Sequence, residues 1–230
     1  MKNTKQNGLP LRTGLFGGTF DPIHIGHLQV AMDVRERFSL DRIYLIPSAM
    51  PPHKTNEALA PASDRYEMVR LALGDHESLE ASDVETTRGG RSYSCDTVRY
   101  FKARVPENGS LFFLVGVDAF MEIHTWKNYA SLFDQVAFIV MTRPPGGRSF
   151  EAFTGAVQHY VQQEISPHYA LMRERAALMH ENKKPIYLTA VTPVDIASTQ
   201  IRRMIRGNQP IDAWVEPGVA DYIRQRGLYR

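Results

Sequence analysis

Several features that would assign this 230-residue chain to a special class are missing from it. Cys95 is its one cysteine, so an internal disulfide and a cysteine-rich zinc site are both excluded. Its 27 lysines and arginines against 25 aspartates and glutamates leave no basic excess of the kind that marks a dedicated nucleic-acid-binding protein. The longest apolar runs, such as VAFIVM at 136–141, are too short to cross a membrane. We therefore expect a globular protein that binds neither nucleic acid nor membranes.

The beginning of the chain lacks the apolar segment of a signal peptide, because MKNTKQNGLPLRTG is polar. We expect a cytoplasmic protein in which residues 1–12 form a flexible tail. No repeat, low-complexity segment or linker divides the remainder, so one domain is predicted over residues 13–230.

Short apolar runs alternate with helical patterns, which is typical of βαβ units around a parallel sheet. The helix at 63–74 is expected to have a serine cap at Ser63 and to end at Gly74. Two more helical patterns, separated by Ser166 and Pro167, predict a helical insertion over 149–182. The fold class is α/β, a Rossmann-like open parallel sheet with helices on both faces. Expected strands are 13–18, 42–48, 78–84, 110–118, 135–143 and 186–192, and expected helices are 27–38, 63–74, 94–105, 128–133, 198–206 and 217–227.

The run GGTFDPIHIGH, residues 17–27, joins the first expected strand to the first expected helix. A helix start at the carboxyl end of a parallel strand offers free N–H groups and about half a positive charge to an anion. Gly17 and Gly18 let the backbone approach a phosphate, and Gly26 removes a side chain between the helix and a ligand. His24 and His27 are spaced to face the same anion. The alternative is a histidine-rich helix start that only caps itself.

The segment DIASTQIRRMIRG, residues 195–207, predicts a second anion site. Ser198 and Thr199 are candidate caps at the start of a helix, and Arg202 follows one turn later. A hydroxyl group, free N–H groups and a guanidinium would converge there. As an ordinary capped amphipathic helix, the same segment would need no ligand.

Both segments resemble motifs of the nucleotidyltransferase superfamily. HIGH at 24–27 matches its HxGH signature, and IASTQIR resembles its ISSTxIR motif with Ala197 in place of the first serine. The patterns GxxxxGK[ST] and GxGxxG are absent, and so is the KMSKS-type loop of a class I aminoacyl-tRNA synthetase. The resemblance implies a nucleotidyltransferase fold that binds ATP. It implies the ATP-binding residues Gly17, Gly18, Thr19, Phe20, His24, Gly26, His27, Ile196, Ser198, Thr199 and Arg202.

Further segments narrow the resemblance to the bacterial nicotinate-nucleotide adenylyltransferase family, whose members join ATP and nicotinate mononucleotide into deamido-NAD. These segments are PPHK (51–54), RGGRSYSCDT (88–97), VGVDAFMEIHTWKNY (115–129), MTRPPG (141–146) and VEPGVADYIRQRGLY (215–229). The chain departs from the family at Ser48, where asparagine is common, and at Ser94, where threonine is usual. The resemblance implies the mononucleotide-binding residues Ser48, His53, Lys54, Ser94, Gly116, Asp118, Trp126 and Arg143.

The residue types suit this substrate. A cationic pyridinium ring stacks favourably on a tryptophan face such as that of Trp126, by about 1 to 2 kcal/mol when water is excluded. Ser94 can donate to the ring carboxylate, and Asp118 can accept from ribose hydroxyls. The alternatives are a core tryptophan at 126 and a helix cap at 118.

The resemblance and the residues together predict direct attack by the mononucleotide phosphate on the α-phosphorus of ATP. His24, His27 and Arg202 would stabilise the leaving pyrophosphate, and Lys54 would bring the phosphates together. Mg²⁺ is expected to arrive with ATP, because no carboxylate cluster predicts a metal site in the protein. A sister transferase for pantetheine phosphate, a catalytically silent nucleotide-binding regulator and a homo-oligomeric assembly stay open at this point.

Overall fold

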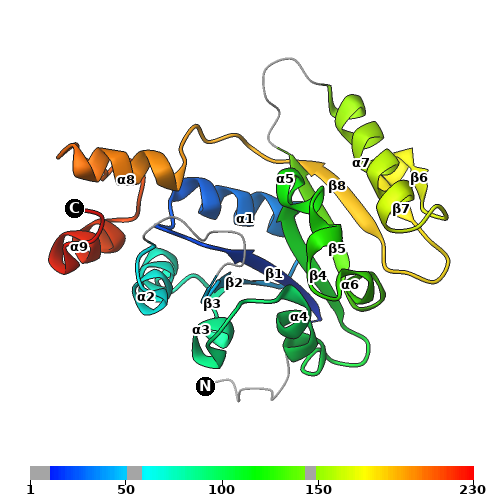
Figure 1. Ribbon diagram of the computed structural model, residues 1–230, viewed down its shortest axis with the longest axis horizontal. Helices are drawn as coiled ribbons and strands as arrows, with labels where there is room; N and C mark the ends of the chain where they lie inside the picture. The colour runs from blue at the N-terminus through cyan, green and yellow to red at the C-terminus, as the bar shows by residue number, and fades with distance from the viewer. Residues whose placement is uncertain (1–10, 51–58, 143–148) are drawn as a thin grey trace.

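The computed structural model describes residues 11–50, 59–142 and 149–230. These residues build one sheet with helices on both of its faces (Figure 1). Its strands are β1 (Arg12–Gly18), β2 (Arg42–Pro47), β3 (Leu79–Ala81), β4 (Ser110–Gly116), β5 (Ala137–Thr142), β6 (Ala170–Met172), β7 (Ala177–Met179) and β8 (Ile186–Ala190). The helices are α1 (Ile25–Arg37), α2 (Ala62–Leu73), α3 (Val84–Arg88), α4 (Ser94–Lys102), α5 (Val117–Phe120), α6 (Tyr129–Gln135), α7 (Phe150–Glu164), α8 (Ser198–Arg206) and α9 (Pro217–Arg226), with 3₁₀ turns η1 (Ile123–Thr125) and η2 (Arg173–Arg175).

The order of the strands confirms the expected Rossmann-like class. Across the sheet it runs β3-β2-β1-β4-β5-β8-β7-β6, and every pair from β3 to β8 is parallel. β1 lies between β2 and β4, so the chain winds outward from β1 in both directions. In such sheets, ligands bind beyond the carboxyl ends of the two strands at this reversal. By this rule, a ligand is expected near Gly18 at the end of β1 and Gly116 at the end of β4.

Alternate residues of each strand face two separate apolar cores, because side chains point to opposite faces of a strand in turn. Phe16 and Leu114 face the core covered by α1, α2, α8 and α9. Leu15 and Phe113 face the core covered by α4, α6 and α7. The central strands are therefore buried on both sides, as their continuous apolar runs predict.

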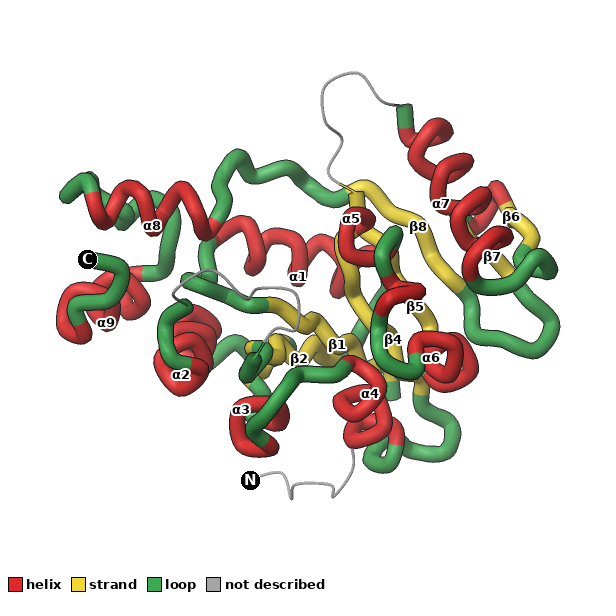
Figure 2. The backbone as a smooth tube through the Cα atoms, in the orientation of Figure 1, coloured by secondary structure: helices red, strands yellow, loops and turns green. Residues whose placement is uncertain are grey.

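The expected insertion over 149–182 is only half helical. α7 forms as predicted, but the second helical pattern instead gives the strands β6 and β7, which lie beside α7 in Figure 2. β7 pairs antiparallel with β8, so the sheet is mixed at this edge. The prediction failed because Ala177 and Leu178 become fully buried against the sheet, and this burial outweighs a helical preference of only a few tenths of a kcal/mol per residue.

The expected cap at Ser63 is also wrong. α2 begins at Ala62, with Pro61 at the N-cap position, so Ser63 lies within the first turn. The Pro61 carbonyl accepts the N–H of Arg65, which fixes the earlier start. Gly74 ends the helix as predicted, at a φ of 51° that glycine adopts readily. No helix of the described residues combines the length and the apolar composition that a membrane span requires.

Candidate active site at the carboxyl ends of β1 and β4

The two histidines of the first loop lie stacked at the start of α1. His24 is the N-cap residue and is only 3% exposed, and its ring centroid lies 3.7 Å from that of His27. The backbone N–H of His24 donates to Nδ1 of His27 at 3.3 Å. An Nδ1 that accepts a hydrogen bond carries no proton, so a neutral His27 holds its proton on Nε2. The ring N–H of His27 is then on Nε2.

The glycines of this loop make room mainly for the protein's own rings. A Cβ at Gly18 would lie 2.9 Å from the Phe20 ring. A Cβ at Gly26 would lie 3.1 Å from the ring of His24. Gly26 thus makes room for the buried imidazole of His24, a packing role that was not expected from the sequence. Only Gly17 is open, with its nearest neighbour at 3.9 Å.

The start of α8, which the sequence predicted as a second anion site, is attached to the same loop (Figure 1). The Ser198 hydroxyl donates to the Pro22 carbonyl at 2.9 Å. Arg202 is 5% exposed and donates through Nη1 to the Asp21 carbonyl at 2.8 Å, with the Asp21 carboxylate 3.6 Å away. The two helix starts therefore meet at one place. Arg202 is held inside the protein at this junction, so the structure gives it a bracing role beside its predicted phosphate role, and Ile196 just before α8 is buried.

Asp21 and Tyr229 belong to this junction and were missed in the sequence. Asp21 is 1% exposed, and its Oδ1 accepts from the Tyr229 hydroxyl at 2.7 Å and from the Ala60 N–H at 3.1 Å. Burial, together with the neighbouring Asp21 carboxylate, raises the pKa of Tyr229. The DP step in GGTFDP is the only local signal for Asp21. Nothing in the sequence joins it to a tyrosine 208 positions later.

Arg65 was missed as well, although it connects three loops. Its guanidinium is 1% exposed and donates to three backbone carbonyls, those of Ala60 at 2.9 Å, Thr19 at 2.8 Å and Ala49 at 3.0 Å. Burial lowers the pKa of this group, and the nearby Asp21 carboxylate works against that shift. In the sequence, Arg65 resembles any charged residue on a helix surface. Nothing there predicts that its side chain points into the protein.

A pocket of about 300 Å³ opens between the ends of β1, β2 and β4 and the start of α4. Trp126 forms one wall; its ring is partly exposed and meets Phe113 edge to face, with centroids 6.1 Å apart. The alternative of a buried core tryptophan is therefore wrong. Ser94, the first residue of α4, lies on the same pocket. The predicted residues gathered here are Gly17, Gly18, Thr19, Ser48, Ser94, Gly116 and Trp126.

Asp118 lies elsewhere. It is exposed on α5 and lines a second hollow of about 910 Å³, on the side of α1 and α7. Phe16 and Gly116 border both hollows, so the two spaces meet at the carboxyl ends of β1 and β4. The structure thus separates Asp118 from Ser94 and Trp126, which the sequence had grouped together. His53, Lys54 and Arg143 fall outside the described residues.

Comparisons with known proteins identify the family. The Cytidylyltransferase-like family model matches residues 15–204. The "Probable nicotinate-nucleotide adenylyltransferase" of Desulfatibacillum aliphaticivorans is 44% identical over 225 residues, covering 95% of this chain and 100% of the relative. The chain belongs to the nicotinate-nucleotide adenylyltransferase family. A second member, named in the same way in Geobacter metallireducens, is 38% identical and covers 95% of this chain and 98% of the relative.

The fold of this nicotinate-nucleotide adenylyltransferase family member also has solved counterparts. The nicotinic acid mononucleotide adenylyltransferase of Plasmodium falciparum, complexed with NaAD, superimposes with a TM-score of 0.66 at 18% identity. The match covers 94% of this chain and 96% of that one. At this identity the likeness supports the fold.

Proposed function

We propose that this chain transfers the adenylyl group of ATP to nicotinate mononucleotide, with deamido-NAD and pyrophosphate as products. The observation that carries the proposal is the meeting of two helix starts, α1 and α8, next to two hollows that share Phe16 and Gly116. One anion-binding junction between two ligand spaces suits a reaction that joins two phosphorylated nucleotides.

ATP is proposed to place its triphosphate at the junction and its adenosine in the 910 Å³ hollow. His24, His27, Ser198 and Thr199 would surround the phosphates, whose charge the two helix starts offset. Asp118 lines the adenosine hollow, so it is a candidate acceptor for the adenosine ribose hydroxyls. This places Asp118 with ATP, in place of the mononucleotide side expected from the sequence.

Nicotinate mononucleotide is proposed to occupy the 300 Å³ pocket. Its ring would stack on Trp126, and its carboxylate would face Ser94 and the N–H groups at the start of α4. Ser48 has a buried Oγ without a hydrogen-bond partner at the rim of this pocket. We propose that this hydroxyl binds the mononucleotide phosphate, and that His53 and Lys54, which lie outside the described residues, bind the same phosphate.

The chemistry needs alignment more than acid–base catalysis. A phosphate oxygen of the mononucleotide attacks the α-phosphorus of ATP in line, and the bond to the pyrophosphate oxygen breaks. The attacking oxygen is already anionic, so no proton has to be removed. The Nε2 proton of His27 and the helix starts would stabilise charge on the departing pyrophosphate. No group of three or more acidic, histidine or cysteine side chains within the described ranges could hold a metal ion, so we propose that Mg²⁺ enters bound to ATP.

Release of pyrophosphate from ATP tests this function against its two rivals. We expect release with nicotinate mononucleotide and none above background with pantetheine phosphate. Release with pantetheine phosphate alone would establish the sister transferase, and binding of ATP without release would establish a silent regulator.

The Trp126→Ala variant tests whether the pyridine ring binds in the 300 Å³ pocket, which we call the pyridine pocket. It is expected to raise KM for nicotinate mononucleotide about 10-fold, since a desolvated cation–π contact is lost, and to leave KM for ATP unchanged. Tyr100→Ala is the matched control, because Tyr100 is exposed on the outer side of α4. An unchanged KM for the mononucleotide in Trp126→Ala would show that the pyridine ring does not bind in this pocket.

A further inference from the structure

Glu85 is a buried carboxylate on the wall of the pyridine pocket, and the mechanism above does not use it. It lies on α3, is 7% exposed and borders the same 300 Å³ space as Trp126 and Ser94. Other acidic residues near this space, such as Asp96, are engaged in ion pairs on the surface. The burial of the Glu85 carboxylate at this pocket therefore needs a separate physical explanation.

The carboxylate of Glu85 forms no salt bridge with the described residues around it. Its Oε1 accepts from the hydroxyl of Thr97 at 2.5 Å, and Thr97 is itself 1% exposed. Arg88 points Nη2 at Thr97 Oγ1, at 3.4 Å, and makes no ion pair with the carboxylate. No lysine, arginine or histidine of the described chain reaches Glu85 within salt-bridge distance. A buried carboxylate in this condition costs free energy unless a positive partner arrives.

The start of α4, which borders the same pocket, has the opposite character. Ser94 stands at the start of α4, where the helix presents N–H groups and partial positive charge. Lys127 also borders the pocket, with its Nζ 4.2 Å from the centre of the Tyr93 ring. The pocket thus combines partial positive charge at the start of α4 with the buried carboxylate of Glu85.

A nicotinate ring carries a matching pair of charges. Its carboxylate is attached to one ring carbon, and its positive charge is centred on the ring nitrogen that bears the ribose. With the carboxylate at the start of α4 and the ring face on Trp126, the cationic ring comes to lie against the wall that Glu85 forms. A dihydropyridine ring of the same size carries no such charge.

We propose that Glu85 is a specificity-determining residue that makes this pocket select a cationic pyridinium ring over the neutral dihydropyridine ring of a reduced mononucleotide. The inference rests on the proposed function, because it takes the 300 Å³ space as the site of the ring. It adds a charge requirement that neither the aromatic stacking nor the hydroxyl of Ser94 supplies.

The Glu85→Gln variant tests the proposal, because glutamine keeps the volume and an oxygen that can accept from Thr97. KM for nicotinate mononucleotide should rise about 10-fold while kcat stays within about twofold and KM for ATP is unchanged. Inhibition by dihydronicotinate mononucleotide should keep its parental Ki, so that the preference for the oxidised ring falls about 10-fold. Glu80→Gln is the matched control, since Glu80 is half-exposed on β3 and pairs with Arg42.

Two further variants separate charge from structure. Thr97→Val removes the hydroxyl but keeps the carboxylate, so ring selectivity should persist. Glu85→Asp keeps the charge and should retain most of the selectivity, including in a case where Glu85→Gln fails to fold. Equal weakening of both nucleotides in Glu85→Gln would overturn the proposal and leave Glu85 as a support for Thr97.

Direct binding keeps this test apart from that of the proposed function. Quenching of tryptophan fluorescence measures affinity for the oxidised and reduced mononucleotides without ATP. A parent protein that releases no pyrophosphate yet prefers the oxidised ring would refute the reaction and support the role of Glu85. A parent protein that releases pyrophosphate but binds both rings equally would support the reaction and refute the role of Glu85.

Discussion

His24 and His27 show how a short motif becomes a defined arrangement. His24 is buried at the N-cap of α1, and its backbone N–H fixes the tautomer of His27 through Nδ1. The Nε2–H group of His27 is therefore oriented before any substrate arrives. Such prior orientation is what lets a hydrogen-bond donor stabilise charge that develops only during the reaction.

Replacing His27 with alanine should lower kcat by about 100-fold, the usual loss when one donor to a developing negative charge is removed. KM for ATP should change much less, because the N–H groups of the helix start remain. Steady-state pyrophosphate release measures both constants. His159→Ala serves as the control, since His159 is exposed on α7. Turnover within about threefold of the parent in folded His27→Ala protein would end this assignment.

At the level of elements, the site depends on how separate loops are held at a fixed distance. Arg65, from α2, binds the carbonyl of Thr19 in the loop after β1 and that of Ala49 in the loop after β2. These are the loops proposed for the triphosphate and for the mononucleotide phosphate. A rigid planar guanidinium suits this task better than an ammonium group, because it donates in several fixed directions at once.

Arg65→Met should lower the free energy of unfolding by about 3 kcal/mol, since three buried carbonyls lose a donor at about 1 kcal/mol each. Urea unfolding followed by circular dichroism measures this loss. Arg70→Met is the control, because exposed Arg70 pairs only with Glu67, and its midpoint should not move.

Arg65→Lys keeps the charge but not the geometry, so it tests alignment separately from stability. We expect a folded protein with kcat reduced at least about 10-fold under saturating substrates. A full loss of stability with parental kcat would show that Arg65 has only a structural role.

The insertion supports the wall of the 300 Å³ pocket that carries Trp126. The Tyr160 hydroxyl of α7 contacts Nδ1 of His124 at 2.8 Å, just before Trp126. The hydroxyl of Tyr129, just after Trp126, donates to the Glu164 carbonyl at the end of α7. α7 thus braces the turn that carries Trp126 on both sides.

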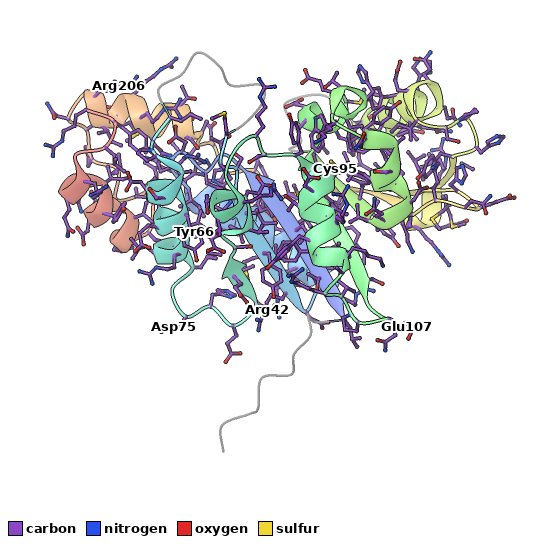
Figure 3. All side chains as sticks on the ribbon, turned by 60° about the horizontal axis from the view of Figure 1, so that its bottom comes forward. Arg42, Tyr66, Asp75, Cys95, Glu107 and Arg206 are labelled. Atoms are coloured by element: carbon purple, nitrogen blue, oxygen red, sulfur yellow. The ribbon has the colours of Figure 1, made fainter. Side chains whose placement is uncertain are left out.

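On the scale of the whole molecule, the accessibility of Cys95 shows whether the apolar core around α4 is intact. It lies on α4, labelled in Figure 3, is 1% exposed and is the chain's one cysteine. Burial raises the pKa of its thiol, so both access and thiolate content are low in the native state. The rate of its alkylation therefore measures opening of the fold.

Iodoacetamide should modify Cys95 at least about 100-fold more slowly in native protein than in urea, as mass spectrometry can follow. In the native protein the rate should still be rising with pH beyond the ordinary pKa of a cysteine, because the thiol is held protonated. Nicotinate mononucleotide should slow the reaction further, since the adjacent Ser94 contacts the proposed ligand space. Equal rates with and without urea would contradict the burial of this side chain.

The central strands and their order of appearance could be predicted because continuous apolar runs and helix periodicity are local properties. The other expected strands formed with small differences at their ends, but the strand expected over 78–84 is shortened to β3, and Val84 instead begins α3. The edge strands β6 and β7 could not be predicted, since the helix formers around Ala177 and Leu178 acquire strand structure only by pairing with β8. An edge strand of this kind forms only where it can pair with a neighbouring strand, and a local window of sequence does not contain that strand.

The same division applies to the site. Gly17, His24, His27 and Trp126 were identifiable from short motifs, because anion binding and ring stacking require particular residue types at short spacings. Asp21, Arg65, Glu85 and Tyr229 became visible only when the fold buried their polar groups and chose their partners. Charge in a sequence does not reveal whether a side chain faces water or the interior. Burial decides this, and burial is a property of the packed chain alone.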